Sequence, residues 1–396
     1  ANITNDSSQG IVGNGLVSAR VNNNSRITSQ NGTLVIETAA NNNDWDGTTD
    51  NGLLYGQSGT LELRDTAGFV FDGTVQANSG STVFANGFEL RFAPASTLDL
   101  NGGTYRSTDA TEIAGTVDVA AGPDSTLQIT GTTVFAASSN TTLNGDLVLN
   151  NTSTVVESGA TFSGGASLVN SVGRTLTLHD GADVDVLIEN NGTLSLGASP
   201  GQTTGLDFEQ TASGTWDLEL GGTGLNDYDR MTLTGVASLA GELDISTIGG
   251  YTPTLGNTFS IILAGSVVGT FDNVTGSPGA GLEYDVAYNA GSVILSVIAG
   301  GLAGDLDGDG FVGINDLNIV LANWNQNVPP ANPLADPSGD GFVGIDDLNE
   351  VLGNWNAGTP PADLSQTQIP EPTTGLFATA GVISLVFRRR RHKMVC

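Results

Sequence analysis

Basic residues are scarce in this sequence, and nearly half of them lie at its end. Lysine and arginine together number 12 against 42 aspartate and glutamate residues, so the formal net charge is −30. Before Phe387 the chain holds seven arginines and no lysine. Proteins that bind nucleic acid need clustered lysine and arginine to neutralise phosphate groups. The composition therefore excludes nucleic acid as a partner and suits a secreted protein in a medium that contains calcium.

Cysteine and histidine are almost absent as well. Cys396 is the single cysteine, so the chain forms no internal disulfide. His179 and His392 are the two histidines. A histidine-dependent catalytic triad would rest on His179, which neighbours Asp180 but more simply sits at a strand edge.

Paired carboxylates offer little else for catalysis. Asp183 and Asp185 alternate along one expected strand and could act as acid and base, as glycosidases require. A solvated strand face is the simpler interpretation in so acidic a chain. Asp227 and Asp229 precede Arg230, and we expect a local salt bridge to that arginine. The sequence assigns no catalytic residue, so we lean against an enzyme.

Glycine is abundant, at 55 of 396 residues, and short alternating runs recur between the glycines. The recurring phrase is a small residue, threonine, then apolar-x-apolar, which is a strand signal. It occurs at 32–36, 59–63, 96–100, 115–119, 125–129 and 192–196. Many short strands fit a β-sandwich or a stacked parallel β-helix. We expect a mainly β protein with a right-handed parallel β-helix, because stacking gives rungs one continuous core.

The predicted solenoid covers 1–196, and 197–299 forms its C-terminal part or cap. Residues 197–299 carry longer strand-like runs, such as Gly214–Leu220 and Val293–Val297. Their order resembles the C-terminal part of autotransporter passenger β-helices. A cap would protect the unpaired strand edges at the end of the solenoid. The chain opens on Ala1 without a basic and apolar leader, so we expect a removed signal or a fragment.

Two acidic, glycine-containing passages repeat near the C-terminus, at Asp305–Asp316 and Asp336–Asp347. A 12-residue calcium loop places ligands at positions 1, 3, 5, 7, 9 and 12, with glycine at position 6. The spacing thus predicts two Ca²⁺ sites, with backbone carbonyls at position 7 and a water at position 9. The predicted protein ligands are Asp305, Asp307, Asp309, Phe311 and Asp316 in the first loop and Asp336, Ser338, Asp340, Phe342 and Asp347 in the second. The alternative is an acidic turn without metal.

An amphipathic segment follows each loop. Leu317, Val320, Leu321 and Trp324 fall at helical spacing, and Leu348, Val351, Leu352 and Trp355 repeat it. We predict two helices with both tryptophans in the core between them. Val312 and Val343, at loop position 8, are expected to form a short β-bridge between the two loops.

This pair of loop-and-helix units resembles a dockerin, a small all-α EF-hand-like pair, over 300–363. The resemblance implies calcium-dependent docking to a cohesin-like partner. Positions 10 and 11, which often select the partner in that family, are Ile314-Asn315 and Ile345-Asp346. Position 12 is aspartate, whereas ordinary EF-hands carry glutamate there. Since Ser338 replaces an acid, we expect the second loop to bind calcium more weakly.

The last segment, 364–396, combines a linker with a three-part tail. Pro370-Glu-Pro372 precedes the uncharged, apolar run Thr373–Phe387, and the basic cluster Arg388–Lys393 follows. Fifteen helical residues span about 22 Å, short of the roughly 30 Å membrane core. The tail resembles the PEP-CTERM sorting signal, which implies processing by an exosortase and delivery to the envelope or beyond. A plain membrane tail anchor and a nuclear-type basic run are the alternatives.

Three functions remain open on the sequence. The first is a non-catalytic protein of the cell surface or extracellular matrix, with a β-helical stalk and a docking module. The second is a polysaccharide hydrolase or lyase on the β-helix, which only association supports. The third is a carbohydrate-binding module whose stacking platform would use Trp45, Phe69, Phe71, Tyr105 and Trp216.

Overall fold

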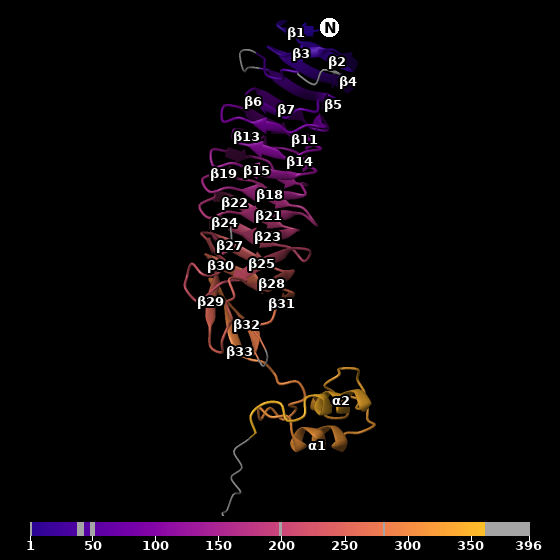
Figure 1. Cartoon of the computed structure of the whole chain (residues 1–396), viewed down its shortest axis with the longest axis vertical. Helices are drawn as coiled ribbons and strands as arrows, with labels where there is room; N and C mark the ends of the chain where they lie inside the picture. The colour runs from indigo at the N-terminus through magenta and orange to yellow at the C-terminus, as the bar shows by residue number, and fades with distance from the viewer. Residues whose placement is uncertain (1, 38–42, 48–51, 198–199, 280–281, 361–396) are drawn as a thin grey trace, which may run out of the picture. The chain divides into compact units, whose positions relative to one another are not determined.

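The computed structural model describes residues 2–37, 43–47, 52–197, 200–279 and 282–360 (Figure 1). The chain divides into two compact units, Ala1–Gly300 and Gly301–Cys396. The predicted C-terminal hydrophobic helix and sorting tail lie outside the described residues. Within the described residues, no helix is long and apolar enough to cross a membrane.

The first unit is a parallel β-solenoid of about nine turns, as predicted, rather than a β-sandwich (Figure 1). A two-stranded sheet pairs β1 (Asn2–Thr4) with β3 (Arg20–Asn22). One ten-stranded sheet stacks β6 (Phe69–Phe71), β9 (Leu90–Phe92), β12 (Thr111–Ile113), β15 (Thr132–Phe135), β18 (Ser153–Val156), β21 (Thr175–Leu178), β23 (Thr193–Leu196), β25 (Thr215–Leu220), β28 (Glu242–Thr247) and β31 (Asn273–Thr275).

The larger sheet holds the remaining strands of the solenoid. Its members are β2 (Ile11–Ser18), β4 (Arg26–Glu37), β5 (Leu53–Arg64), β7 (Thr74–Asn78), β8 (Thr82–Asn86), β10 (Thr97–Asn101), β11 (Thr104–Ser107), β13 (Thr116–Val119), β14 (Ser125–Ile129), β16 (Asn140–Leu143), β17 (Leu147–Leu149), β19 (Thr161–Gly164), β20 (Ser167–Asn170), β22 (Asp183–Asn190), β24 (Gln202–Gln210), β26 (Arg230–Leu233), β27 (Val236–Leu239), β29 (Thr258–Leu263), β30 (Ser266–Gly269), β32 (Leu282–Asn289) and β33 (Ser292–Ala299). Long strands continue round a corner: β5 pairs with both β7 and β8.

Alternation in the sequence explains which side chains form the core. In β10, Leu98 and Leu100 are buried while the residues between and beside them are half-exposed. The parallel register places Leu98 beside Val117 of the next turn and Leu100 beside Val119. Because successive side chains of a strand point to opposite faces, each short phrase contributes one inward row to a shared core.

The C-terminal end of the solenoid changes its strand direction. β33 pairs antiparallel with β29 and with β32. The glycine-rich composition of Val297–Gly304 predicts a linker, but β33 continues to Ala299, so this stretch begins with strand. Antiparallel pairing occupies edges that a further parallel turn would otherwise fill.

The expected aromatic platform is wrong, because most of its members lie inside the solenoid. Trp45, Trp216, Phe71 and Tyr105 are each 0% exposed, and Phe69 is half-buried. Aromatic rings bury large apolar areas, so the interior of a turn is their favourable place. They pack on neighbouring rings there, as Phe92 does edge-on against both Phe71 and Tyr105.

A ladder of buried amides runs through three turns of the solenoid. The Asn170 Nδ2 donates to Asn190 Oδ1 at 2.9 Å, and Asn190 Nδ2 donates to Gln210 Oε1 at 3.3 Å. All three are nearly fully buried and stand in register on β20, β22 and β24. Their remaining hydrogens bind backbone carbonyls, such as that of Thr215. Buried amides are tolerated here because all three amide nitrogens find acceptors, although Asn170 Oδ1 has no hydrogen-bond partner.

The second unit holds α1 (Ile314–Ala322), a short 3₁₀ turn (Pro333–Ala335) and α2 (Ile345–Gly353). Pro329, Pro330 and Pro333 predict a rigid, non-helical connection between the copies. The structure has the 3₁₀ turn there, and the Asn332 side chain caps its start. Both predicted helices are present. Their small core consists of Val312, Val320, Ala331, Ala335, Val343 and Val351.

The predicted place of the two tryptophans is wrong. Trp324 is 40% exposed and Trp355 is 39% exposed. The helices end at Ala322 and Gly353, so each tryptophan lies beyond the last helical turn. A residue after the helix no longer shares the helical face, and valines fill the space between the helices instead.

Candidate metal centre

The first acidic loop brings three carboxylates together. One carboxylate oxygen from each of Asp305, Asp307 and Asp309 lies within 4.8 Å of the others. Asp305 shapes the turn, because it accepts hydrogen bonds from the backbone N of Gly308 at 2.9 Å and of Gly310 at 2.8 Å. Gly310 has φ +84°, which a side chain would disfavour, so the predicted turn position needs glycine.

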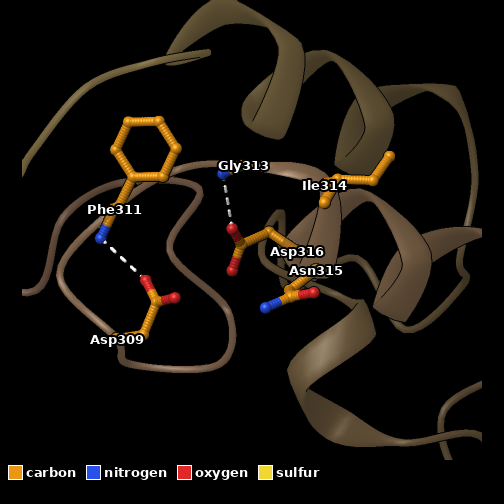
Figure 2. Close-up of a pocket in the computed structure, with 6 residues that line it drawn as sticks. All are labelled: Asp309, Phe311, Gly313, Ile314, Asn315 and Asp316. Carbon is orange, nitrogen blue, oxygen red and sulfur yellow. Dashed lines mark hydrogen bonds between the residues drawn. The ribbon is translucent and has the colours of Figure 1, made fainter. Parts of the chain in front are cut away.

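Asp316, the predicted ligand at position 12, does not belong to that group of three. Its side chain is buried and accepts backbone hydrogen bonds from Leu306 at 2.7 Å, Asp307 at 3.1 Å and Gly313 at 2.7 Å. Figure 2 shows Asp316 bonded to Gly313, while Asp309 accepts from the Phe311 N at 2.9 Å. Asp316 thus joins both ends of the loop to the first turn of α1.

The second loop groups its carboxylates differently. Asp336, Asp340 and Asp347 have carboxylate oxygens within 4.8 Å of one another. The Ser338 hydroxyl donates to Asp336 at 3.2 Å, and Asp340 accepts from the Phe342 N at 2.8 Å. The predicted position 12 therefore joins the group in this copy.

Hydrogen bonds keep the buried Asp347 carboxylate charged. Burial by itself raises the pKa of Asp347, but backbone N–H donors outweigh burial and hold that pKa below its ordinary value. Those donors are the Gly344 N at 2.6 Å and the Ser338 N at 3.1 Å. The same carboxylate lies at the start of α2, where a helix favours negative charge.

The expected bridge between the two loops is wrong, because each loop pairs with the segment that follows the opposite helix. The Val312 N donates to the Ala357 carbonyl oxygen at 2.9 Å. The Val343 N donates to the Gln326 carbonyl oxygen, also at 2.9 Å. Two short antiparallel bridges result, Phe311 with Gly358 and Asn327 with Phe342. The two valines remain buried between them.

The donor set fits a hard divalent cation. Each group offers three carboxylates, and the sequence adds carbonyl and hydroxyl oxygens at calcium-loop spacing. Oxygen ligands of this kind suit calcium, whereas zinc sites favour cysteine and histidine. Three carboxylates this close repel one another, and a bound cation would offset that repulsion.

A scan against protein-family models finds no matching family, and a search of curated proteins finds no match.

The residues considered for catalysis are scattered over the solenoid surface. His179 follows β21, and its Nδ1 lies 3.1 Å from Glu157 Oε2 rather than against Asp180. Asp183 and Asp185 are both exposed on β22. These two carboxylates therefore lie on a solvent-exposed face of the strand, as the simpler interpretation expected.

The predicted salt bridge to Arg230 is wrong. Asp229 is fully buried and accepts from the backbone N of Gly201 at 2.6 Å and of Glu219 at 2.9 Å. Asp227 instead accepts from the Gly224 N at 3.1 Å. The Arg230 Nε is buried without a hydrogen-bond partner. The donors to Asp229, Gly201 and Glu219, are distant in the sequence, so local sequence does not predict these hydrogen bonds.

Two buried acids that sequence reasoning missed have raised pKa values. Burial raises the pKa of Asp229 to about 7, against the lowering effect of its backbone donors, and Glu219 and Asp217 add to the rise. Burial likewise raises the pKa of Asp46 to about 6, with nearby Asp44 adding to the rise.

Proposed function

We propose that this chain is an exported, non-catalytic protein of the cell surface or extracellular matrix. The solenoid acts as a scaffold, and the second unit acts as a dockerin-like module with two Ca²⁺ sites and a cohesin-like partner. The observation that carries the proposal is the repetition: two groups of three carboxylates occupy matching, helix-preceding loops. The C-terminal tail would serve sorting by an exosortase-type enzyme.

Exposed apolar side chains on the two helices support docking to a protein. Ile314 and Leu321 of α1 are 60% and 50% exposed, and Ile345 and Leu352 of α2 are 58% and 48% exposed. The equivalent positions in the two copies therefore present the same chemistry to a partner. Such a pair of apolar faces on a small unit is typical of an interaction surface.

Calcium titration of the full chain by calorimetry tests the metal sites. Two binding events are expected, and Asp309→Asn or Asp340→Asn each removes one of them, because each loses a central carboxylate. Asp183→Asn, at an exposed solenoid position, leaves both events in place. Absence of calcium binding by the unmodified chain contradicts the proposal.

Docking is tested separately with immobilised full-length protein and a panel of purified cohesin modules. Retention in millimolar calcium and release by chelator are expected. The double variant Leu321→Ser and Leu352→Ser, at exposed helix positions outside the loops, should weaken retention while leaving the calcium titration unchanged. Binding that persists in chelator, or no binding to any module, contradicts the docking function but leaves the metal sites standing.

A further inference from the structure

Each acidic loop is clamped by a strap from the opposite half of the second unit. We define strap A as residues 356–359, after α2, and strap B as residues 325–328, after α1. Strap A pairs with the first loop: the Asn356 N donates to the Val312 carbonyl oxygen at 3.0 Å, and the Thr359 N donates to that of Gly310 at 3.0 Å.

Strap B repeats this arrangement on the second loop. The Asn325 N donates to the Val343 carbonyl oxygen at 2.9 Å, and the Val328 N donates to that of Gly341 at 2.9 Å. Asn325 and Asn356 occupy the same place in the two straps, with φ +59° and +63°. Asparagine tolerates this left-handed backbone, which turns the chain from the helix end onto the opposite loop.

The bonds from each strap fall on either side of a predicted carbonyl ligand. In the first loop they engage Gly310 and Val312, which flank Phe311, and in the second Gly341 and Val343, which flank Phe342. Fixing the backbone on both sides of a ligand lowers the entropy that ion binding must otherwise remove.

We propose that straps A and B position the carbonyl ligands of the opposite calcium loops. The proposal rests on the proposed calcium function. Ordering the first loop around an ion favours the docked strap A, and a docked strap A in turn favours the ion-binding form of that loop.

Gly358 is the position at which strap A can be disturbed without touching a carboxylate. Its φ is +88°, and a Cβ there would collide with the Gly310 carbonyl oxygen and approach the Leu302 side chain. Gly353, the last residue of α2, has open space around its Cα. Gly353→Ala is therefore a matched control, with the same chemical change five positions earlier in the chain.

The experiment is a calcium titration of the full chain by calorimetry, in the Asp340→Asn background that leaves the first site active. Gly358→Ala is expected to weaken calcium binding at the first site by about tenfold, within the range of coupling between contacting groups. Gly353→Ala is expected to leave it unchanged. Thr359→Pro, which removes one strap hydrogen bond, should give a smaller loss and covers the case that Gly358→Ala does not fold.

The outcomes separate the two proposals. If the Asp340→Asn protein binds calcium and both strap variants match Gly353→Ala, the strap proposal is overturned while the calcium function stands. If neither the Asp340→Asn protein nor the unmodified chain binds calcium, both proposals are overturned. Weaker calcium binding in Gly358→Ala and in Thr359→Pro, with unchanged binding in Gly353→Ala, supports positioning by strap A.

Discussion

One side chain distinguishes the two acidic loops at position 3, where the first has Asp307 and the second has Ser338. In the second loop the hydroxyl of Ser338 donates to Asp336, and Asp347 supplies the third carboxylate of the group. Calcium loops tune affinity by the number of charged ligands. At the residue scale, we therefore expect position 3 to set the ranking of the two proposed sites.

Ser338→Asp is expected to raise calcium affinity at the second site by roughly tenfold, because it adds a charged ligand. Asp307→Ser should lower affinity at the first site by a similar factor. Calorimetry on the full chain measures both. Equal affinities in the parent, or a change in the opposite direction on either swap, would rule out ranking by charge count.

Asp229 makes the stability of the solenoid depend on pH. Its pKa is about 7 in the folded protein and near its ordinary 3.8 when unfolded. Between these values the folded state holds a proton that the unfolded state has lost, so stability falls as pH rises from about 4 to 7. Across this pH range, Asp229 lowers the free energy of unfolding by up to about 4 kcal/mol.

Denaturant unfolding at pH 4.5 and at pH 7.5 measures this effect. Asp229→Asn should reduce the drop in the free energy of unfolding of the first unit, because the residue no longer titrates. Asp227→Asn, at an exposed position two residues away, should leave the drop unchanged. An equal drop in the parent and in Asp229→Asn would contradict the assignment.

At the scale of elements, the amide ladder links β20, β22 and β24. Asn190 is its central member, bonded to Asn170 on one side and to Gln210 on the other. Removing one partner leaves buried polar atoms without hydrogen bonds, which costs more than the bonds themselves contribute. The ladder therefore makes the register of these three turns costly to change.

Asn190→Ala is expected to lower the free energy of unfolding of the first unit by about 2–4 kcal/mol. Asn191→Ala, at the next and half-buried position, should cost about 1 kcal/mol or less. Chemical denaturation followed by far-ultraviolet circular dichroism provides the comparison. Equal losses in the two variants would show that the ladder has no special role.

The apolar-x-apolar part of each of the six strand phrases falls in a strand, for example in β13 (Thr116–Val119) and in β23 (Thr193–Leu196). Alternation is a local property, so a short run can show it. Because asparagine tolerates left-handed backbone, Asn150-Asn151 predicts a tight corner of that geometry. This prediction is wrong, since neither residue has positive φ. Asn151 is buried and accepts from the Ile129 N of the preceding turn, a partner that becomes adjacent only on folding.

At the scale of the whole molecule, the chain forms two compact units with separate cores. The solenoid core extends through its turns and contains no predicted metal ligand. The core of the second unit consists of four valines and two alanines, which is small for independent stability. Bound calcium would supply much of the stability of such a unit.

Differential scanning calorimetry of the full chain should show two transitions in millimolar calcium. Excess chelator is expected to remove or sharply lower the transition of the second unit and to leave that of the solenoid in place. The double variant Asp309→Asn and Asp340→Asn should behave in calcium as the parent does in chelator. Identical scans with and without chelator would exclude a calcium-dependent second unit.

The sequence by itself determined the alternating strands, the two acidic loops and the helices that follow them, because these depend on neighbours along the chain. Tertiary structure alone decided that Trp45 and Trp216 point inward, that Asp229 is buried, and that each loop is clamped by the opposite strap. The physical reason is distance along the chain: partners in adjacent turns, or across a pair of helices, meet only when the backbone has folded.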